Sequence, residues 1–281
     1  MIFDSHAHLV SDDFERYPPT PLGGTLDRKL DDPVTAEKLL ALMDANGVDR
    51  AVAVQRAHVY GYNNDYVIDS AERYPDRLVA VCVIDADAVD GPAVVRRWAE
   101  RGAVGMRLSE KTRGAGTDWL ASDRALATWA EVSRLRLSMC VHMYRWNRDE
   151  VLLALAALAA KFPSVPLVID HLSNVIEESG APDWGVDAAL NALAAHAQVR
   201  LKFSQINLAR MAKNAVPAAS VIERVVRAFG AERVMWGSDV AQSAGTYEEM
   251  VRMAQAAVAN LSKSEQQLLL HGCAKAVYSK Q

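Results

Sequence analysis

The stretch TAEKLLALMDANGVDRAVAVQ, residues 35–55, contains one complete unit of the pattern that decides the fold. Its first part has helical period, with Leu39 and Met43 on one face and Gly47 as a stop signal. Its second part, residues 49–55, is a short apolar run that does not alternate with polar residues. Such a run is typical of a strand that is buried on both faces of a parallel sheet.

The same unit repeats along the chain. Further amphipathic helical stretches lie at residues 123–136, 147–163 and 247–261. The runs that predict strands cover residues 1–9, 49–55, 77–85, 103–109, 136–143, 166–172, 199–205 and 233–239. Eight strands that alternate with eight helices predict an α/β protein, the (β/α)8 TIM barrel. Because we find no linker or shift in composition, we expect a single domain over residues 1–281.

Composition and charge exclude several classes of protein. Hydrophobic residues make up 51% and charged residues 23%, the balance of a globular protein with a substantial core. The formal net charge is -4 and both signs are interspersed, so we expect neither nucleic acid nor a membrane surface as partner. The three cysteines are far apart and form no CxxC, which favours a cytoplasmic protein without disulfides. We also expect no signal peptide and no membrane span.

Polar side chains gather at the C-terminal ends of the predicted strands, where a TIM barrel builds its active site. His6 and His8 are two residues apart on the first strand and therefore face the same side. The other strand ends add Arg107, His142, Asp170, His171 and Asp239. Three or four nitrogen and oxygen ligands with one open position are what a zinc-type ion needs to activate water.

These motifs, in this order, resemble the amidohydrolase superfamily, and within it the amidohydrolase-related branch called family 2. The motifs that carry the likeness are DSHAHL (4–9), MDANGVDRAVAVQ (43–55), GMRLS (105–109), VHM (141–143), IDHLSN (169–174) and MWGSDVA (235–241). Residues 52–71 are similar to the second-strand region of the carboxylated-lactone hydrolases of the 2-pyrone-4,6-dicarboxylate lactonase type. The decarboxylases of the same branch are the other close relatives.

The resemblance implies a catalytic role for each of the strand-end groups. It makes His6, His8, His142 and Asp239 metal ligands, with Asp239 also the base that activates water. It implies that His171 polarises the scissile carbonyl or orients the nucleophile. Two-metal members bridge their metals with a lysine or glutamate on the fourth strand, where this chain has Arg107. We therefore expect one divalent ion, zinc before manganese, and a metal-free reaction stays open.

Arginines near the predicted barrel mouth indicate a small anionic substrate. Arg107 can clamp a carboxylate with two parallel hydrogen bonds. Arg56, Arg113 and Arg145 are further candidates for the same task, and Tyr144 is a candidate for the pocket wall.

Further predictions concern one loop, two aspartates and one histidine. The stretch 11–33 is rich in Pro, Gly and Asp and follows the first strand, so we expect a lid or pocket wall. Asp4 and Asp170 precede the histidines, and we expect both to point away from the site as structural hydrogen-bonding groups. His58 lies in the loop after the second strand and is a minor candidate for substrate contact.

The leading hypothesis is a hydrolase that opens a small carboxylated lactone with metal-activated or Asp239-activated water. A metal-dependent, non-oxidative decarboxylase of an aromatic or muconate-like acid is the second hypothesis. A barrel that binds a ligand without turnover is the third. A homodimer is left open by the sequence.

Overall fold

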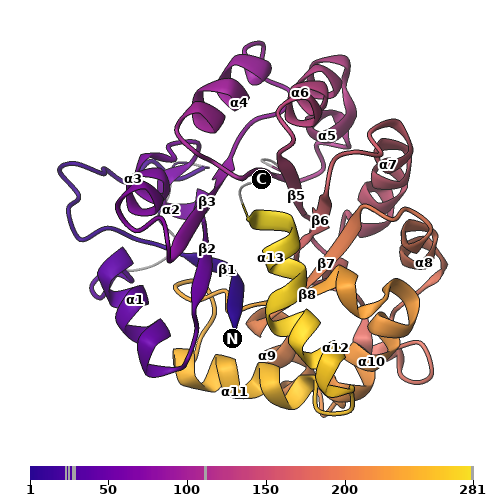
Figure 1. Ribbon diagram of the computed structural model, residues 1–281. Coiled ribbons are helices and arrows are strands. Elements are labelled where there is room, and N and C mark those ends of the chain that lie inside the picture. Colours follow the sequence, from indigo (N-terminus) through magenta and orange to yellow (C-terminus); the bar gives the residue numbers. More distant parts are fainter. Residues whose placement is uncertain (23, 25, 27–29, 111–112, 280–281) are drawn as a thin grey trace.

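Eight parallel strands form one sheet in the order of the chain (Figure 1). The structure is a computed structural model that describes residues 1–22, 24, 26, 30–110 and 113–279. The strands are β1 (Phe3–His8), β2 (Arg50–Val54), β3 (Leu78–Val83), β4 (Gly105–Ser109), β5 (Ser138–His142), β6 (Leu167–Ile169), β7 (Val199–Ser204) and β8 (Val234–Gly237). The barrel closes between β8 and β1, where the N–H of Asp239, just after β8, donates to the His6 carbonyl of β1 at 2.7 Å. The predicted TIM barrel is confirmed.

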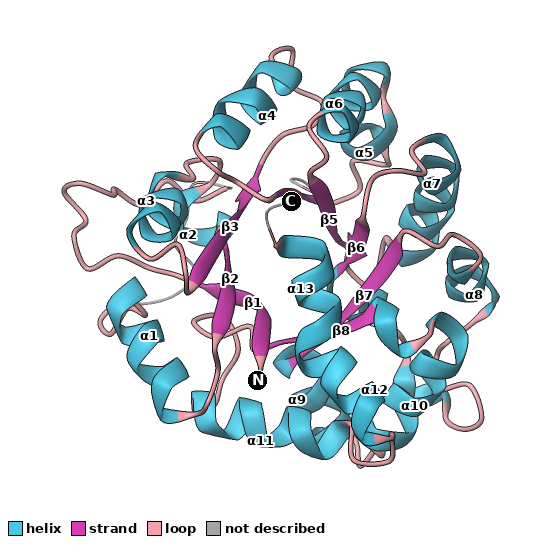
Figure 2. Cartoon of the chain, in the orientation of Figure 1, coloured by secondary structure: helices cyan, strands magenta, loops and turns pink. Residues whose placement is uncertain are grey.

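The helices form a ring around the strands (Figure 2). They are α1 (Ala36–Ala45), α2 (Ala57–Tyr60), α3 (Asp65–Arg73), α4 (Gly91–Glu100), α5 (Asp118–Ala121), α6 (Asp123–Arg134), α7 (Arg148–Lys161), α8 (Ala188–Ala194), α9 (Gln205–Lys213), α10 (Ala218–Phe229), α11 (Tyr247–Ala257), α12 (Lys263–Gln267) and α13 (Cys273–Tyr278). Side-chain caps stabilise the N-termini of several helices. The side-chain oxygens of Thr35, Ser122 and Thr246 accept backbone N–H groups of the first turn.

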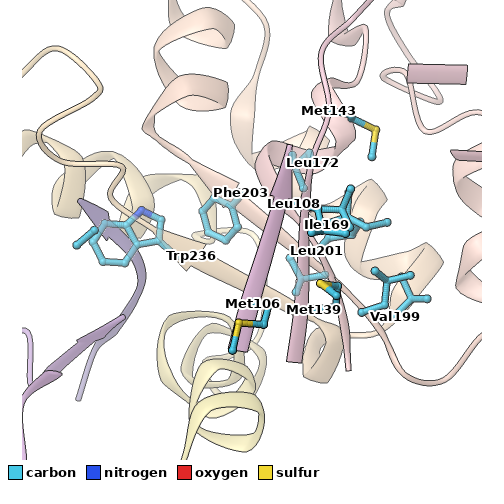
Figure 3. Close-up of a cluster of buried hydrophobic side chains, with 14 of the residues drawn as sticks. Met106, Leu108, Met139, Met143, Ile169, Leu172, Val199, Leu201, Phe203 and Trp236 are labelled. Atoms are coloured by element: carbon cyan, nitrogen blue, oxygen red, sulfur yellow. The ribbon is translucent and has the colours of Figure 1, made fainter. Parts of the chain in front are cut away.

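The strands are buried on both faces, as their apolar runs predict. Alternate residues such as Met106, Leu108, Met139 and Leu201 point outward into the layer between sheet and helices (Figure 3). The residues between them point into the barrel.

Helix α13 closes one end of the barrel. It lies across the centre of the view in Figure 1. Its residues Cys273, Ala274 and Tyr278 pack against inward-facing strand residues such as Phe3 and Val52. These strand residues lie toward the N-terminal ends of their strands, so the C-terminal ends are left as the open mouth.

Two strands depart from their predicted course. The register of β1 shifts between Asp4 and Ala7, so the alternation of its side chains is interrupted there. Strand β6 ends at Ile169 instead of Leu172. Both irregularities lie at the mouth of the barrel and determine which side chains face the interior.

In the described part of the chain, we find no helix with the length and apolar character needed to cross a membrane.

Candidate active site

Three ligand-type side chains converge at the mouth of the barrel. The Asp239 Oδ1 atom lies 3.3 Å from His8 Nε2 and 3.6 Å from His6 Nε2. The two histidine Nε2 atoms are 3.3 Å apart. The irregular register of β1 turns both rings inward, whereas Asp4 faces outward and accepts a hydrogen bond from Tyr247 of α11 at 3.0 Å. The expected structural role of Asp4 is thus confirmed.

The hydrogen bonds around this cluster leave lone pairs at its centre. His8 Nδ1 lies 2.8 Å from the Val54 carbonyl, which can only accept, so a neutral His8 ring has a lone pair on Nε2. Asp239 Oδ2 accepts from Ser243 Oγ at 2.7 Å. Asp239 Oδ1 is buried and has no hydrogen-bond partner among the described residues. A buried carboxylate oxygen without a partner, next to two imidazole nitrogens, fits one divalent cation.

A second layer of charges lies deeper in the barrel. Asp170 Oδ2 accepts from Arg107 Nε at 2.7 Å, and Asp170 Oδ1 lies 3.3 Å from Lys202 Nζ and 3.5 Å from His6 Nδ1. The expectation that Asp170 points away from the site is therefore wrong. Val168 points into the barrel, so the alternation of β6 turns Asp170 inward as well, and it is His171, with a φ of 52°, that departs from the alternation.

His171 lies on a left-handed turn after β6. His171, Leu172, Ser173 and Asn174 all have φ between 50° and 53°. Each non-glycine residue in this region costs roughly 1–2 kcal/mol, so surrounding contacts must hold the turn. Asn207 of α9 donates to the His171 carbonyl at 2.9 Å. The turn brings the His171 ring to 5.0 Å from the His6 ring, measured between centroids.

The side chain of His171 contacts Ser204 and packs against the His6 and His142 rings. Its Nδ1 lies 2.6 Å from Ser204 Oγ at the end of β7. The other nitrogen is left for the pocket, which the residue lines. His171 thus lines the cavity, and its role toward a carbonyl stays a prediction.

His142 lies at the mouth but outside the tight ligand cluster. Its Nδ1 is 3.2 Å from Ser109 Oγ, and its ring packs against Tyr144 and His171. Among the described residues, it is not one of the groups whose ligand atoms gather within 4.8 Å. Its role as a further metal ligand stays a prediction.

Burial and neighbouring groups determine the protonation of three histidines and of Asp239. Burial lowers the pKa of the His6, His142 and His171 rings below the usual value, so neutral imidazoles are favoured. Burial also raises the pKa of the Asp239 carboxyl, but the neighbouring His8, His171 and His6 outweigh it and the pKa falls below the usual range. The site therefore offers a carboxylate beside neutral ring nitrogens, the forms that bind a cation.

A cavity of about 320 Å³ opens above the cluster. It is lined by His8, Leu22, Arg56, Ala57, His58, Arg107, Ser109, Glu110, His142, Tyr144, His171, Asn174, Ile206, Asp239 and Gln242. Leu22 comes from the predicted lid segment, whose described residues pair with α2 through the N–H of Leu22 and the Ala57 carbonyl at 3.2 Å. Residues 23, 25 and 27–29 of that segment lie outside the described residues.

The predicted substrate-binding residues divide into two sets. Arg56, Arg107 and Tyr144 line the cavity. Arg145 instead pairs with Glu177 and Glu178, with N–O distances of 3.0 and 2.9 Å.

Arg113 does not line the cavity either. It is exposed, and its guanidinium stacks on Trp146 at 4.8 Å from the ring centroid. For Arg113 and Arg145, the predicted contact with substrate has no support from the geometry.

The principal residue that sequence reasoning missed is Lys202. Its side chain is fully buried inside the barrel. A signal was available, because Lys202 shares strand parity with Ser204 in a run whose other residues are mostly apolar. A charged residue in such a strand is almost always paired.

Comparisons with known proteins agree with this geometry. A family model described as amidohydrolase matches residues 3–280. The chain belongs to the amidohydrolase family. No curated protein matches this amidohydrolase.

Solved structures share the fold of this amidohydrolase at low sequence identity. One is a probable 2-pyrone-4,6-dicarboxylic acid hydrolase from Acinetobacter baumannii with citric acid bound, at 20% identity and TM-score 0.78, covering 99% of this chain and 98% of that one. Another is an amidohydrolase from Burkholderia multivorans with bound zinc, at 21% identity and TM-score 0.75, covering 99% of each chain. A third is the 2,6-dihydroxybenzoate decarboxylase from Rhizobium, at 14% identity and TM-score 0.69, covering 99% and 98%.

Proposed function

We propose that this amidohydrolase opens a small carboxylated lactone by hydrolysis, with one divalent metal ion at His6, His8 and Asp239. The observation that carries the proposal is the buried Asp239 Oδ1, which faces two ring nitrogens and has no hydrogen-bond partner among the described residues. Zinc is the first candidate for the ion and manganese the second. The zinc reported for the Burkholderia multivorans amidohydrolase is consistent with this choice.

The ion supplies a Lewis acid that polarises the ester carbonyl and makes water a stronger nucleophile near neutral pH. Asp239 is the base in this scheme, because its carboxylate lies at the mouth and accepts a proton from the attacking water. The hydrogen bond from Ser243 holds the other carboxylate oxygen in place. His171 also lines the cavity and stabilises the oxyanion that forms at the carbonyl.

Two arginines in the cavity support a substrate that carries a carboxylate. Arg56 and Arg107 line the cavity from the ends of β2 and β4, and both are buried. A buried guanidinium binds a carboxylate strongly because little water competes for it. The citric acid in the Acinetobacter baumannii relative is an anionic ligand of similar chemistry. Arg107 is already oriented by Asp170, so its position does not depend on substrate.

A panel of carboxylated lactones, followed by proton release and mass spectrometry of the products, tests the proposal. We expect ring-opened acids that are heavier than the substrate by one water. The same panel includes hydroxylated aromatic acids, because the fold is shared with a decarboxylase. Release of carbon dioxide from these acids without lactone opening would replace hydrolysis by decarboxylation at the same cluster.

A further inference from the structure

Two buried side chains compete for one nitrogen of His6. Lys202 Nζ, which can only donate, lies 3.4 Å from His6 Nδ1. Asp170 Oδ1, an acceptor, lies 3.5 Å from the same nitrogen. A ring nitrogen accepts a hydrogen bond with its lone pair or donates one with its hydrogen, but it cannot do both. Only one of these two neighbours can therefore bond to His6 Nδ1 at a time.

The first arrangement has Lys202 as the partner. His6 Nδ1 then carries the lone pair, so the hydrogen of the neutral ring is on Nε2. That nitrogen lies 3.3 Å from His8 Nε2, which is an acceptor because His8 Nδ1 is bonded to the Val54 carbonyl. The pattern is self-consistent, but it leaves His6 Nε2 without a lone pair for a metal ion.

The second arrangement has Asp170 as the partner. A metal ion on His6 Nε2 needs the lone pair there, so the ring hydrogen must lie on Nδ1. Asp170 Oδ1 is the acceptor at that position, and it has no hydrogen-bond partner among the described residues. A carboxylate that accepts from a ligand histidine strengthens its bond to the metal. Lys202 still has Asp170, at 3.3 Å, and the Tyr278 ring, at 5.4 Å, as neighbours.

We propose that Lys202 and Asp170 are opposing positioning residues of the metal site. Lys202 holds His6 in the form that cannot bind a metal ion, and Asp170 holds it in the form that can. The affinity for metal is thus limited from inside the barrel by a residue that touches neither substrate nor metal. This inference rests on the metal-binding part of the proposed function and is independent of the reaction.

Zinc titration of the metal-free protein against a competing chelator tests the inference. We expect K202M to bind zinc about tenfold more tightly than the wild type, and D170N about tenfold more weakly. The matched control is K161M, which removes the same charge from an exposed position at the end of α7. We expect its zinc affinity to equal that of the wild type. A K202M affinity equal to or below that of K161M would overturn the inference.

Nitrogen-15 NMR of histidine-labelled protein distinguishes two effects of Lys202. One is control of which His6 nitrogen carries the ring hydrogen, and the other is simple repulsion between the lysine charge and the metal ion. In the metal-free wild type, we expect the His6 ring hydrogen on Nε2, and in metal-free K202M on Nδ1. Zinc should move it to Nδ1 in the wild type, a measurement that needs no variant to fold. A ring hydrogen on Nδ1 in the metal-free wild type would contradict the inference.

The two proposals fail in different ways. Equal zinc affinities for wild type and K202M overturn the role of Lys202 and leave the proposed hydrolase intact. Absence of zinc binding to both proteins overturns the metal site and, with it, the role of Lys202. Zinc binding without lactone hydrolysis overturns the proposed reaction alone.

Discussion

Asp170 and Arg107 form a buried ion pair, with 2.7 Å between the carboxylate Oδ2 and the guanidinium Nε. The pair joins the arginine-lined side of the cavity to the charged groups beside His6. It also means that substitution of Arg107 removes two interactions at once, because Asp170 loses a partner. Arg56 Nε donates to Gln242 at 3.1 Å instead of to a buried carboxylate, so Arg56 is the preferred position for a test of substrate recognition.

Replacement of Arg56 by methionine should weaken binding of the anionic substrate. A hydrogen bond to a charged group contributes roughly 1.5–3 kcal/mol, so KM should rise by about tenfold or more. The matched control is R113M, at an exposed arginine outside the cavity, which should leave KM unchanged. Steady-state kinetics on the best lactone of the panel gives both values. An equal effect of the two substitutions would exclude Arg56 from substrate binding.

The D239N variant should lose most of the activity. It removes the base and one metal ligand, and general-base catalysis alone contributes about 10²–10⁴ in rate. We expect kcat to fall by about a thousandfold, while circular dichroism shows a folded protein. D149N changes an aspartate whose side chain is 93% exposed and serves as the control. Near-normal turnover by D239N would show that another group activates water.

The stability of the metal-free protein should depend on pH through its buried histidines. Burial lowers the pKa of His6, His142 and His171 below the ordinary value of 6.5, so the unfolded chain binds protons that the folded protein does not. The stabilisation is therefore complete above pH 6.5 and is lost as the pH falls toward the lowered values.

Urea unfolding measures this effect. Between about pH 7.5 and about pH 5.5, the free energy of unfolding should fall by at least about 1 kcal/mol. The variant H142Q should show a smaller fall, because one of the three buried rings is gone. A wild-type stability that stays level over this range would contradict the assigned direction of the pKa shifts.

Glu177 should be important for stability although it lies outside the cavity. Its carboxylate is fully buried and binds Arg145 and Arg210, and Arg210 also donates to Asn174 Oδ1 of the left-handed turn at 3.2 Å. E177Q should reduce the free energy of unfolding by about 2–3 kcal/mol, because hydrogen bonds to charged groups are lost in a buried place. E178Q is the control, since Glu178 is 36% exposed and its pair with Arg145 is worth less than about 1 kcal/mol.

Ser173 offers a substitution that should stabilise the protein. Its φ is 53°, and its buried hydroxyl has no hydrogen-bond partner in the described part of the structure. Glycine adopts this conformation without steric cost and removes the hydroxyl, so S173G should gain about 1 kcal/mol. Thermal and urea unfolding of S173G and wild type provide the comparison. A loss of stability would mean that the Ser173 side chain packs more favourably than its hydrogen bonding indicates.

The sequence predicts the fold well because most of the strands are near-continuous apolar runs between helical stretches. This pattern is local, so residues 49–55 can be assigned to β2 without knowledge of their neighbours in space. The same holds for His6, His8, His171 and Asp239, since the ends of parallel strands meet at one edge of the barrel.

The parts that sequence reasoning misses depend on contacts between distant residues or on local backbone irregularity. The sequence around Arg145 does not indicate its ion pairs, because its partners Glu177 and Glu178 are 32 and 33 residues away. Asp170 shares the inward face of Val168, and His171 also reaches the site only because its backbone is left-handed, which the strand pattern does not reveal. Lys202 could have been noticed, because a lysine in an apolar strand needs a buried partner.

The most direct test of the account is the metal content of the purified protein, measured by mass spectrometry together with lactone hydrolysis before and after chelation. We expect about one equivalent of zinc or manganese per chain, loss of hydrolysis on chelation, and recovery when the ion is returned. Full hydrolysis by metal-free protein would contradict the account, and would leave His6 and His8 as hydrogen-bonding groups around Asp239.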